Sequence, residues 1–431
     1  MMVFFKSLEN YVRIFKIFIL LSHFSISAQS YSIMLDSLKE SGRWGDYYLK
    51  ENSNGFTLIK QNIEVDSLVF TGDTTLRFLT LNSIFNPIKK SPTSAIAASR
   101  FQELQDNHLF IASNSKLSFA RYKDSNIAAV VDIKTDFKSH IGGIIGSNKD
   151  RNGSWKLNGE LDLHLENLFR DGSSLSVFWQ QPSTVYRFLT FQAEYPVFSK
   201  FPFGVSIAYD QEFYEDSYIN EAFSSHLISI GRFGRLKIGS KIETINNIGS
   251  SHISKTRSAS VILQRDRRNA RWLPYSGSFL EVESDIGTYN DRAGDALEIN
   301  SNFHLGVFRP YRSFLLNFKL IGSINHIKDR DGVPAKFIKF GGSSSIRGYQ
   351  ENQFNAEWMT LQSLEFIFGD LPRSQFFTFF DNVYTEDLNI NPSSGFGIRV
   401  FDGKFFYDVS LGFPLGELRE AKLHIKFNTR L

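Results

Sequence analysis

The stretch WKLNGELDLHLE, Trp155 to Glu166, alternates apolar and polar residues, with Gly159 as its one interruption. Successive side chains of a β-strand point to opposite faces, so one face of this strand is apolar and the other is charged. The last ten residues, KLHIKFNTRL, repeat the pattern. Similar segments recur from about Phe137 to Leu431, between turn signals such as NDRAGD, KDRDG and NPSSG. This alternation predicts that the last two thirds of the chain are built from β-strands.

Dividing that region at its turns predicts about sixteen strands, each near the roughly ten residues that a tilted strand needs to cross a bilayer. A soluble β-sandwich is the alternative, because its strands also have one apolar face. Strand length and an aromatic content of 15%, with 43 Phe and 16 Tyr, favour a closed transmembrane barrel over residues 137–431. Lipid forbids unpaired backbone groups, so we expect Leu, Ile and Phe to face outward and charged residues to face a wet interior.

Composition excludes several kinds of site. The 431 residues include no cysteine, which excludes disulfides, thiolate metal sites and thiol nucleophiles. The 48 basic and 45 acidic residues are interleaved and give a net charge of +3, so no basic stripe indicates nucleic-acid binding. The nine histidines are scattered, and we expect no metal site and no cofactor. We expect a protein that is not an enzyme.

The amino end predicts export. Lys6, Arg13 and Lys16 precede or interrupt an apolar segment that ends in IFILL, and small residues then lead to a cleavage site after Ala28. Residues 1–28 therefore resemble a secretory signal peptide. A membrane anchor or a buried helix is the alternative, but the apolar run is shorter than the roughly 20 residues that span a bilayer.

A small soluble module precedes the strand-rich region. Over residues 62–136 the patterns predict a strand, two helices and two more strands, which is a small α+β domain. Residues 29–61 offer too little for a domain of their own, and we treat them as a short segment.

One glycine-rich stretch raises the question of chemistry. FGGSSSIRGYQ, Phe340 to Gln350, lacks the Lys-Ser/Thr ending of a phosphate-binding loop, and none of its serines has glycines at both distances of a nucleophile elbow. What remains is a long loop whose glycines permit a closely packed backbone. Its Arg347 is expected to pair with a carboxylate inside the barrel.

These residues resemble a known family. IRGY, Ile346 to Tyr349, preceded by FGGSSS, resembles the hallmark of the sixth extracellular loop in outer-membrane assembly and secretion barrels. These barrels are of the BamA/TamA type, the bacterial surface antigen superfamily, and include the related two-partner secretion transporters. The resemblance extends to SLEFIFG at 363–369, FFTFFDNVY at 376–384, the hairpin at 393–416, and DRRNARWLPYSGS at 266–278.

The resemblance implies a site and an architecture. The loop would lie between the eleventh and twelfth strands and fold into the lumen, where Asp381 on the inner wall would hold Arg347. Residues 62–136 resemble a single POTRA domain, and 29–61 would be a partial one. The loop motif consists of Gly341, Gly342, Ile346, Arg347, Gly348 and Tyr349. A buried arginine and aspartate also stabilise a loop that has no part in transport.

The resemblance also implies a location and a function. The barrel would lie in the bacterial outer membrane with its amino-terminal domain in the periplasm, and would assist assembly, insertion or translocation of unfolded outer-membrane or secreted client proteins. Accessory periplasmic or lipoprotein subunits would be possible partners. A polypeptide export pore of the two-partner type and a structural surface barrel are the alternatives. The sequence does not identify the client.

A weak seam between the first and last strands is expected from the same family. Glycines weaken strand pairing, and the first predicted strand has three of them, although glycine at an ordinary barrel bend is the alternative. The candidate seam residues are Gly142, Gly143, Gly146, Phe427 and Leu431.

Overall fold

The computed structural model describes residues 36, 47–52, 55–60, 65–73, 75–122, 126–149, 155–183, 185–196, 203–231, 233–249, 252–330, 332–386 and 389–431. The predicted signal peptide lies outside these residues. Among them, no helix combines the length and the apolar character needed to cross a membrane. The chain divides into two compact units, one of residues 1–69, 85–102 and 117–131 and one of residues 70–84, 103–116 and 132–431.

The amino-terminal elements form a small α+β region. The strands β1 (Tyr47–Asn52) and β2 (Gly55–Lys60) pair with each other. After them come β3 (Val65–Gly72), α2 (Phe78–Phe85), α3 (Ser94–Asn107), β4 (Lys116–Tyr122) and β5 (Asn126–Ile133). The last three strands form a sheet in the order β3-β5-β4. This order of strands and helices is compatible with the expected POTRA-like domain.

Two rings and a cap hold part of this region. Phe85 stacks on Phe101 at 6.0 Å between ring centroids, and both are buried. Thr93 caps α3, because its hydroxyl accepts a hydrogen bond from the backbone N–H of Ile96.

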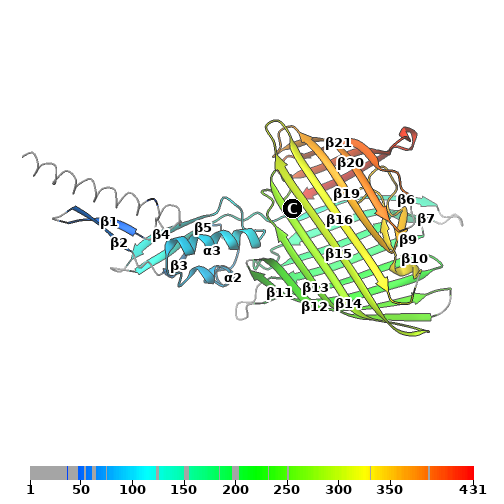
Figure 1. The fold of residues 1–431 in the computed structure, drawn as a ribbon, viewed down its shortest axis with the longest axis horizontal. Coiled ribbons are helices and arrows are strands. Elements are labelled where there is room, and N and C mark those ends of the chain that lie inside the picture. The colour runs from blue at the N-terminus through cyan, green and yellow to red at the C-terminus, as the bar shows by residue number, and fades with distance from the viewer. Residues whose placement is uncertain are drawn as a thin grey trace, which may run out of the picture. The chain divides into compact units, whose positions relative to one another are not determined.

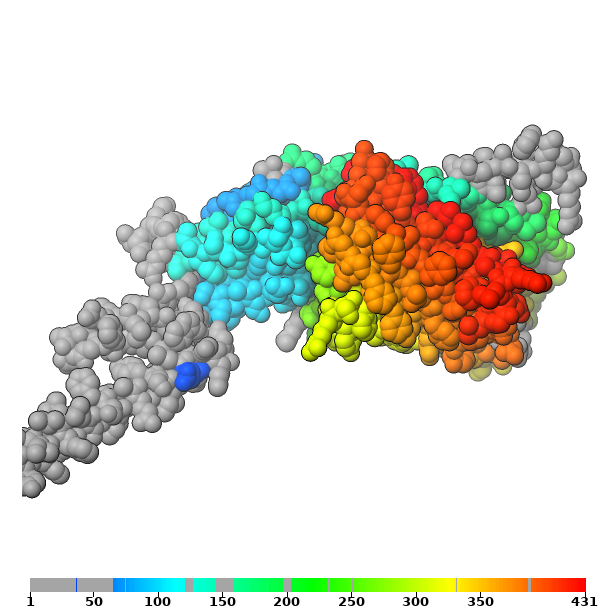
Figure 2. Space-filling view, turned by 90° about the horizontal axis from the view of Figure 1, so that it is seen from above, coloured from blue at the N-terminus to red at the C-terminus, as the bar shows by residue number. Residues whose placement is uncertain are grey.

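Sixteen antiparallel strands close into a barrel in the part of the chain that the structure describes, which confirms the predicted fold class (Figure 1). They follow one another around the barrel in chain order, and the last pairs with the first. Figure 2 shows the last of them, orange to red, side by side on one face. The strands are β6 (His140–Lys149), β7 (Trp155–Glu166), β8 (Ser174–Gln181), β9 (Tyr186–Tyr195), β10 (Gly204–Tyr214), β11 (Tyr218–Gly231), β12 (Gly234–Asn247), β13 (His252–Asp266), β14 (Gly277–Asp291), β15 (Gly294–Pro310), β16 (Leu315–Ile327), β19 (Trp358–Phe368), β20 (Ser374–Thr385), β21 (Ser393–Phe401), β22 (Phe405–Pro414) and β23 (Lys422–Arg430).

The two ends of the barrel are distinguished by the chain segments that each of them carries. The entry end is where β6 begins and β23 ends, and it carries the turns 167–173, 267–276 and 402–404. The loop end carries residues 328–357, between β16 and β19, the eleventh and twelfth barrel strands. Within this long loop, β17 (Ile338–Phe340) and β18 (Phe354–Ala356) form a short hairpin.

The expected alternation of apolar and polar faces holds on many strands. On β13, for example, Ile253 and Val261 are exposed on the outer face. Every second residue between them faces inward and is small and polar: Ser254, Thr256, Ser258 and Ser260. The outer face also carries the exposed Lys255 and Arg257, near the loop end of the strand.

The expectation of a polar interior is wrong for β19 and β20. On β20 the inward rings of Phe377 and Phe379 are buried, while the outward ring of Phe376 is 55% exposed. On β19 Leu361 and Ile367 are fully buried. The physical reason at Leu361 is that the long loop packs against it, so this side chain meets a folded apolar surface and not water. The cluster that includes this contact consists of Phe340, Ile346, Tyr349, Ala356, Met359, Leu361, Val383 and Ile390. Phe377, Phe379 and Ile367 instead pack with Leu315 of β16 in a second apolar cluster. The guanidinium groups of Arg347 and Arg399 lie over the two rings.

Candidate functional site

The loop arginine lies in the lumen against β20 and β19. Arg347 donates to Asp381 through Nε at 2.8 Å and Nη2 at 2.7 Å, and its backbone N–H adds a bond to Asp381 at 3.2 Å. Its Nη1 bonds Glu365 on β19 at 2.6 Å, and Nη2 bonds Ser363 at 3.0 Å. Arg347 is 6% exposed and Asp381 is 0% exposed. The guanidinium is therefore fully engaged by the inner wall.

A second arginine completes this network, and the sequence reasoning missed it. Arg399 on β21 donates to both oxygens of Glu365, at 2.8 and 2.9 Å, and to Asp408 on β22 at 2.9 Å. Glu365 thus stands between two guanidinium groups. The alternation of β21 does place Arg399 on one face, but nothing in the chain says that this face meets Arg347.

Aromatic rings support both guanidinium groups. The Cζ atom of Arg347 lies 3.6 Å from the centroid of Phe379, and that of Arg399 lies 3.9 Å from the centroid of Phe377. A desolvated cation over a ring face is stabilised by the ring quadrupole. The inward phenylalanines of β20 therefore bind the loop network as well as fill the lumen.

Glycine lets the loop touch the wall backbone. Gly348 has φ +89°, a conformation that side-chain-bearing residues rarely adopt, and a Cβ there would lie 2.8 Å from the backbone N of Phe413 on β22. A Cβ on Gly412 would lie 2.7 Å from the backbone N of Gly348. The adjacent Tyr349 donates its hydroxyl to the carbonyl of Asn391 at 2.8 Å. The remaining loop-motif residues lie in the same turn, where Gly342 N–H bonds the Ile346 carbonyl and Gly341 N–H bonds Ser345.

Two lysines tie the same loop to other strands. Lys336 donates to Glu243 on β12 and Glu298 on β15, each at 2.6 Å, and is 7% exposed. Lys339 donates to Tyr218 on β11 at 2.6 Å and also bonds Glu212 on β10. Sequence reasoning missed both lysines. Their ties to β10–β15, together with the Arg347 tie to β19 and β20, show that the loop crosses the lumen.

The barrel closes through a very short ladder. Among the residues that the structure describes, three pairs join β23 to β6: Asn428↔Gly142, Thr429↔Ile141 and Arg430↔His140. The other pairings between neighbouring barrel strands have seven to fifteen pairs among the described residues, as in β8–β9 and β14–β15. We call this short ladder the seam. Beyond it, β6 continues to Lys149 paired only with β7.

The candidate seam residues divide between the ladder and the open part. Gly142 lies in the ladder, and the backbone N–H of Leu431 bonds the carbonyl of Ser139 at 3.0 Å just past its end. Gly143 and Gly146 pair with β7, and Phe427 pairs with Tyr407 on β22, so the ladder does not include these three.

A cavity of about 640 Å³ lies where the seam is open. Gly143 and Ile144 line it from β6, Ile425 and Phe427 line it from β23, and the loop contributes Glu351. Exposed Ile144 and Ile425 give this opening an apolar outer rim. Since backbone groups of both edges face the gap without a ladder, the opening has the geometry to accept another β-strand.

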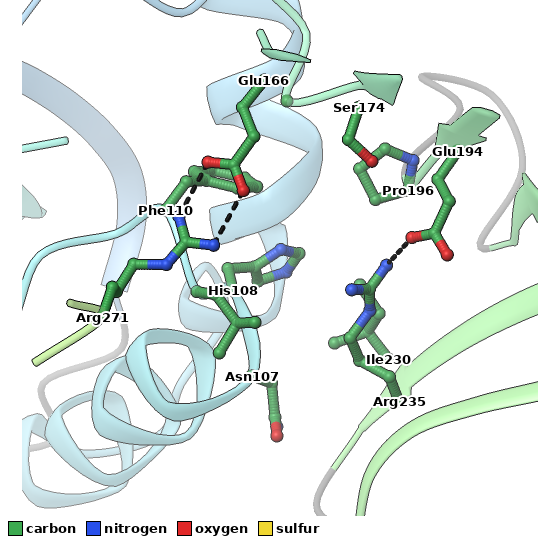
Figure 3. Close-up of a pocket in the computed structure, with 12 residues that line it drawn as sticks. Asn107, His108, Phe110, Glu166, Ser174, Glu194, Pro196, Ile230, Arg235 and Arg271 are labelled. Atoms are coloured by element: carbon green, nitrogen blue, oxygen red, sulfur yellow. Dashed lines mark hydrogen bonds and ion pairs between the residues drawn. The ribbon is translucent and has the colours of Figure 1, made fainter. Parts of the chain in front are cut away.

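Residues 106–110 lie at the entry end and belong to the same compact unit as the barrel. The side chain of Asn107 donates to the carbonyl of Gly231 at 2.6 Å. His108 is 4% exposed, and burial, with a smaller contribution from nearby Arg235, lowers its pKa to about 3. His108 lines a pocket together with Arg235 and Glu194 (Figure 3), and these two charged residues pair at 2.7 Å.

Solved structures with a similar fold are known. BamA from Haemophilus ducreyi lacking POTRA domains 1-3 is 15% identical and matches over 93% of this chain and 93% of its own, with a TM-score of 0.50. CdiB from Escherichia coli is 13% identical over 93% of this chain and 84% of its own, with a TM-score of 0.63. CdiB from Acinetobacter baumannii is 12% identical over 89% and 78%, with a TM-score of 0.58.

Sequence comparison adds no match, since no protein-family model and no curated protein matches this chain. At these identities the similarity concerns the fold. The chain has the fold of the BamA and CdiB barrels, as the resemblance of its loop and last strands implied.

Proposed function

We propose that this protein lies in the bacterial outer membrane and inserts unfolded client proteins by opening sideways between β6 and β23. The observation that carries the proposal is the seam of three residue pairs, continued by a cavity lined by both strand edges. No chemical reaction is involved. The cycle would consist of opening, pairing with a client strand and release.

The energetics of the seam suit a gate. An antiparallel ladder makes about one hydrogen bond per residue pair, and each contributes a net of about 0.5 to 1.5 kcal/mol. Three pairs therefore hold the seam with about 1.5 to 4.5 kcal/mol by this ladder alone. In lipid, each backbone group left unpaired costs several kcal/mol. Opening therefore breaks few bonds, but lipid tolerates the freed edges only when a new strand pairs with them, and a client can supply that strand.

The loop supports a lateral path over a path through the lumen. Residues 328–357 are tied to β19 and β20 through Arg347 and to β12 and β15 through Lys336. A polypeptide moving along the barrel axis would have to displace this loop and break several buried ion pairs. A client entering at the seam would meet one side of the loop, at Lys339, Ser343, Ser344, Glu351 and Asn352, and would leave the Arg347 and Lys336 ties in place.

The amino-terminal region would act in the periplasm and deliver the client. Its sheet order β3-β5-β4 leaves β3 and β4 at the edges. An edge strand has unpaired N–H and C=O groups that an extended peptide can join. Accessory periplasmic or lipoprotein subunits could bind the same region.

A seam-locking experiment tests the proposal. The chain has no cysteine, so the pair Ile141→Cys/Thr429→Cys places two unique thiols on directly opposed residues. We expect the oxidised protein to stay folded in liposomes, to lose insertion of an added unfolded outer-membrane barrel, and to recover it on reduction. The control pair Ile398→Cys/Val409→Cys locks the β21–β22 ladder and leaves both the seam and its cavity unchanged. Full insertion by a completely crosslinked seam would contradict lateral opening.

A polypeptide export pore is the second candidate. The observation in its favour is the polar inner wall along β10–β15, where Lys241 of β12 pairs with Asp285 of β14 at 3.3 Å and Thr256 of β13 donates to Glu298 of β15. This candidate predicts ion conductance in planar bilayers and a dedicated secreted partner. A structural surface barrel, by contrast, predicts that Arg347→Ala changes stability and nothing else.

A further inference from the structure

The turn between β13 and β14, residues 267–276, folds into the barrel at the entry end. It contains the segment RRNARWLPYS, whose family-like pattern has no part in the function proposed above. Asn269 shapes the turn, because its side-chain oxygen accepts hydrogen bonds from the backbone N–H groups of Tyr275 and Ser276 at 3.0 Å. Arg271 and Trp272 lie in the middle of this turn.

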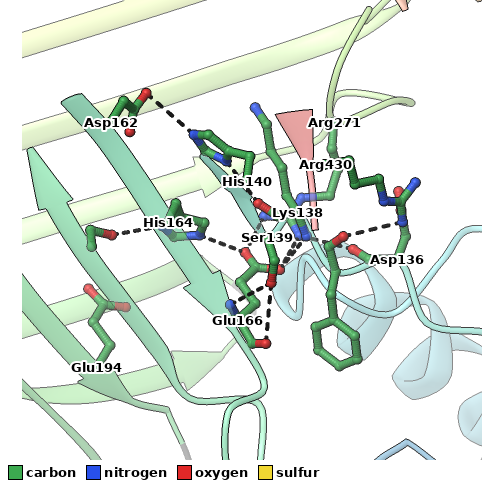
Figure 4. Close-up of polar contacts among 12 residues, drawn as sticks. Asp136, Lys138, Ser139, His140, Asp162, His164, Glu166, Glu194, Arg271 and Arg430 are labelled. Carbon is green, nitrogen blue, oxygen red and sulfur yellow. Dashed lines mark hydrogen bonds and ion pairs between the residues drawn. The ribbon is translucent and has the colours of Figure 1, made fainter. Parts of the chain in front are cut away.

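The turn binds the strands on the β6 side of the seam. Arg271 donates to both oxygens of Glu166, at 2.7 Å each, and to the carbonyl of Asp136 at 3.0 Å (Figure 4). Such a bidentate arginine–carboxylate pair is both strong and directional. Trp272 meets the ring of His140 edge to face at 5.6 Å, and the ammonium of Lys138 lies 5.0 Å from the indole centroid.

The same turn binds strands on the β23 side. Trp272 stacks on Phe401 of β21 at 4.8 Å, with 12° between the ring planes, and contacts Phe406 of β22 at 5.6 Å. Gln375 of β20 donates to the carbonyl of Pro274 at 3.2 Å. One turn therefore contacts both sets of strands that the seam joins.

The turn comes from far around the barrel. β13 and β14 are the eighth and ninth of the sixteen strands, so the turn is covalently anchored about half-way around from the seam. The seam pairs lie at the same end, since His140 contacts Trp272 and is itself paired with Arg430. Moving β6 away from β22 would pull Glu166 and His140 one way and Phe401 and Phe406 the other.

We propose that Arg271 and Trp272 form an internal clasp that holds the seam closed, so that the seam opens only after the clasp releases. Its consequence for client insertion rests on the function proposed above, whereas the clasp itself concerns only the closure of the barrel. A cavity of about 360 Å³ beside Trp272, also lined by His140, Phe406 and Asn428, leaves the ring space to move.

Hydrogen exchange in lipid nanodiscs tests the clasp. The backbone N–H groups of Thr429 and Leu431 at the end of β23, and of Ile141 on β6, point across the seam and exchange through opening of the ladder, so their exchange rate reports the opening equilibrium. We expect Trp272→Ala and Arg271→Gln each to raise this rate at least tenfold. The matched control is Tyr275→Ala, which removes an exposed ring from the same turn and leaves the seam rate unchanged.

The exchange rates of two other ladders distinguish release of the clasp from destabilisation of the whole barrel. The β6–β7 ladder at residues 163–164 and the β22–β23 ladder at residues 410–411 should keep their rates in both clasp variants. The proposal is overturned if the seam rate is unchanged in the folded variants, or if all three ladders loosen equally. Arg271→Gln keeps the indole ring of Trp272, so this variant can still be measured if Trp272→Ala does not fold.

Client insertion separates the clasp from the proposed function. If the seam loosens and insertion of the added barrel becomes faster, both proposals are supported. If the seam loosens and insertion does not change, the clasp stands and lateral insertion fails. If the seam rate stays the same, the clasp fails whatever insertion does.

Discussion

Replacing Arg347 with alanine should cost far more stability than replacing an ordinary surface arginine. Its guanidinium makes four hydrogen bonds, with Asp381, Glu365 and Ser363, in a site where Arg347 is 6% exposed. Removing it leaves Asp381, which is 0% exposed, without its ion-pair partner. Breaking a buried ion pair from one side typically costs about 3 to 5 kcal/mol, whereas an exposed pair contributes about 0 to 1 kcal/mol.

The cost should arise mainly at Asp381 and not at Glu365. Glu365 keeps both of its bonds to Arg399 after the change. Among the described residues, Asp381 forms its ion pair with Arg347, and Lys319 interacts with it from beyond ion-pair distance. Neutralising the orphaned carboxylate should therefore rescue part of the loss. We expect Arg347→Ala/Asp381→Asn to be more stable than Arg347→Ala by at least about 1 kcal/mol.

Reversible urea unfolding in detergent micelles, followed by tryptophan fluorescence and extrapolated linearly to water, measures these free energies. Arg399→Ala is the matched comparison, because it removes a cation from the same network and leaves the loop arginine in place. A loss below about 1 kcal/mol for Arg347→Ala would refute the reasoning, because such a value belongs to an exposed pair. A double variant no more stable than the single one would refute the assignment of the cost to Asp381.

Three further predictions follow from the loop and the entry end. Lys336→Ala removes the ammonium group that lies between Glu243 and Glu298, so the loop should detach from this part of the inner wall. Planar-bilayer recordings should then show more frequent open events than in the wild type. His108→Leu should make the free energy of unfolding less sensitive to acid. The pKa of His108 in the folded protein is lowered to about 3, so the wild-type protein has its full stability above about pH 6.5 and loses stability as the pH drops toward 3. The loss is about 1.4 kcal/mol per pH unit, or about 2 to 3 kcal/mol at pH 4.5. Equal pH slopes of the urea midpoint in the two proteins would contradict this. Gly348→Ala should lower the free energy of unfolding by about 1 to 2 kcal/mol or more, because φ is +89° and the new Cβ would meet the backbone of Phe413. Gly403→Ala is the control: Gly403 also has a positive φ but lies in open space, so this variant measures the cost of the backbone conformation alone.

The loop explains why the inner wall is apolar on one side of the barrel. Phe377 and Phe379 face inward with buried rings, although strand periodicity assigns phenylalanine to the outer face. Both faces of β20 are rich in phenylalanine, as in FFTFF, so alternation with period two does not distinguish the inner from the outer face there. These inner rings pack with Leu315 and Ile367, and the guanidinium groups of the loop residue Arg347 and of Arg399 on β21 cover them.

Local pattern was sufficient for the strands and for the place of the loop. Alternation along segments such as Trp155–Glu166 depends only on neighbouring residues, and the barrel follows because lipid requires that every strand be paired. The loop motif at Ile346–Tyr349 pointed to Arg347 and, by resemblance, to Asp381. The structure brings these two groups to 2.7 Å, although 34 residues separate them in the chain.

The partners that the sequence did not suggest are all distant in the chain. Lys336 meets Glu243 across 93 residues, and Arg271 meets Glu166 across 105. A lysine or glutamate on a barrel strand looks the same in the sequence whether it faces water, an ion pair or a loop. The length of the seam is likewise a property of closure, because three pairs between β23 and β6 depend on the stagger accumulated around all sixteen strands. The sequence by itself determined the strands, the barrel class and the loop arginine, because these depend on local periodicity and a local motif. Only the tertiary structure decided which charges meet in the lumen and how weakly the barrel is closed, because both depend on how the ends of the sheet come together.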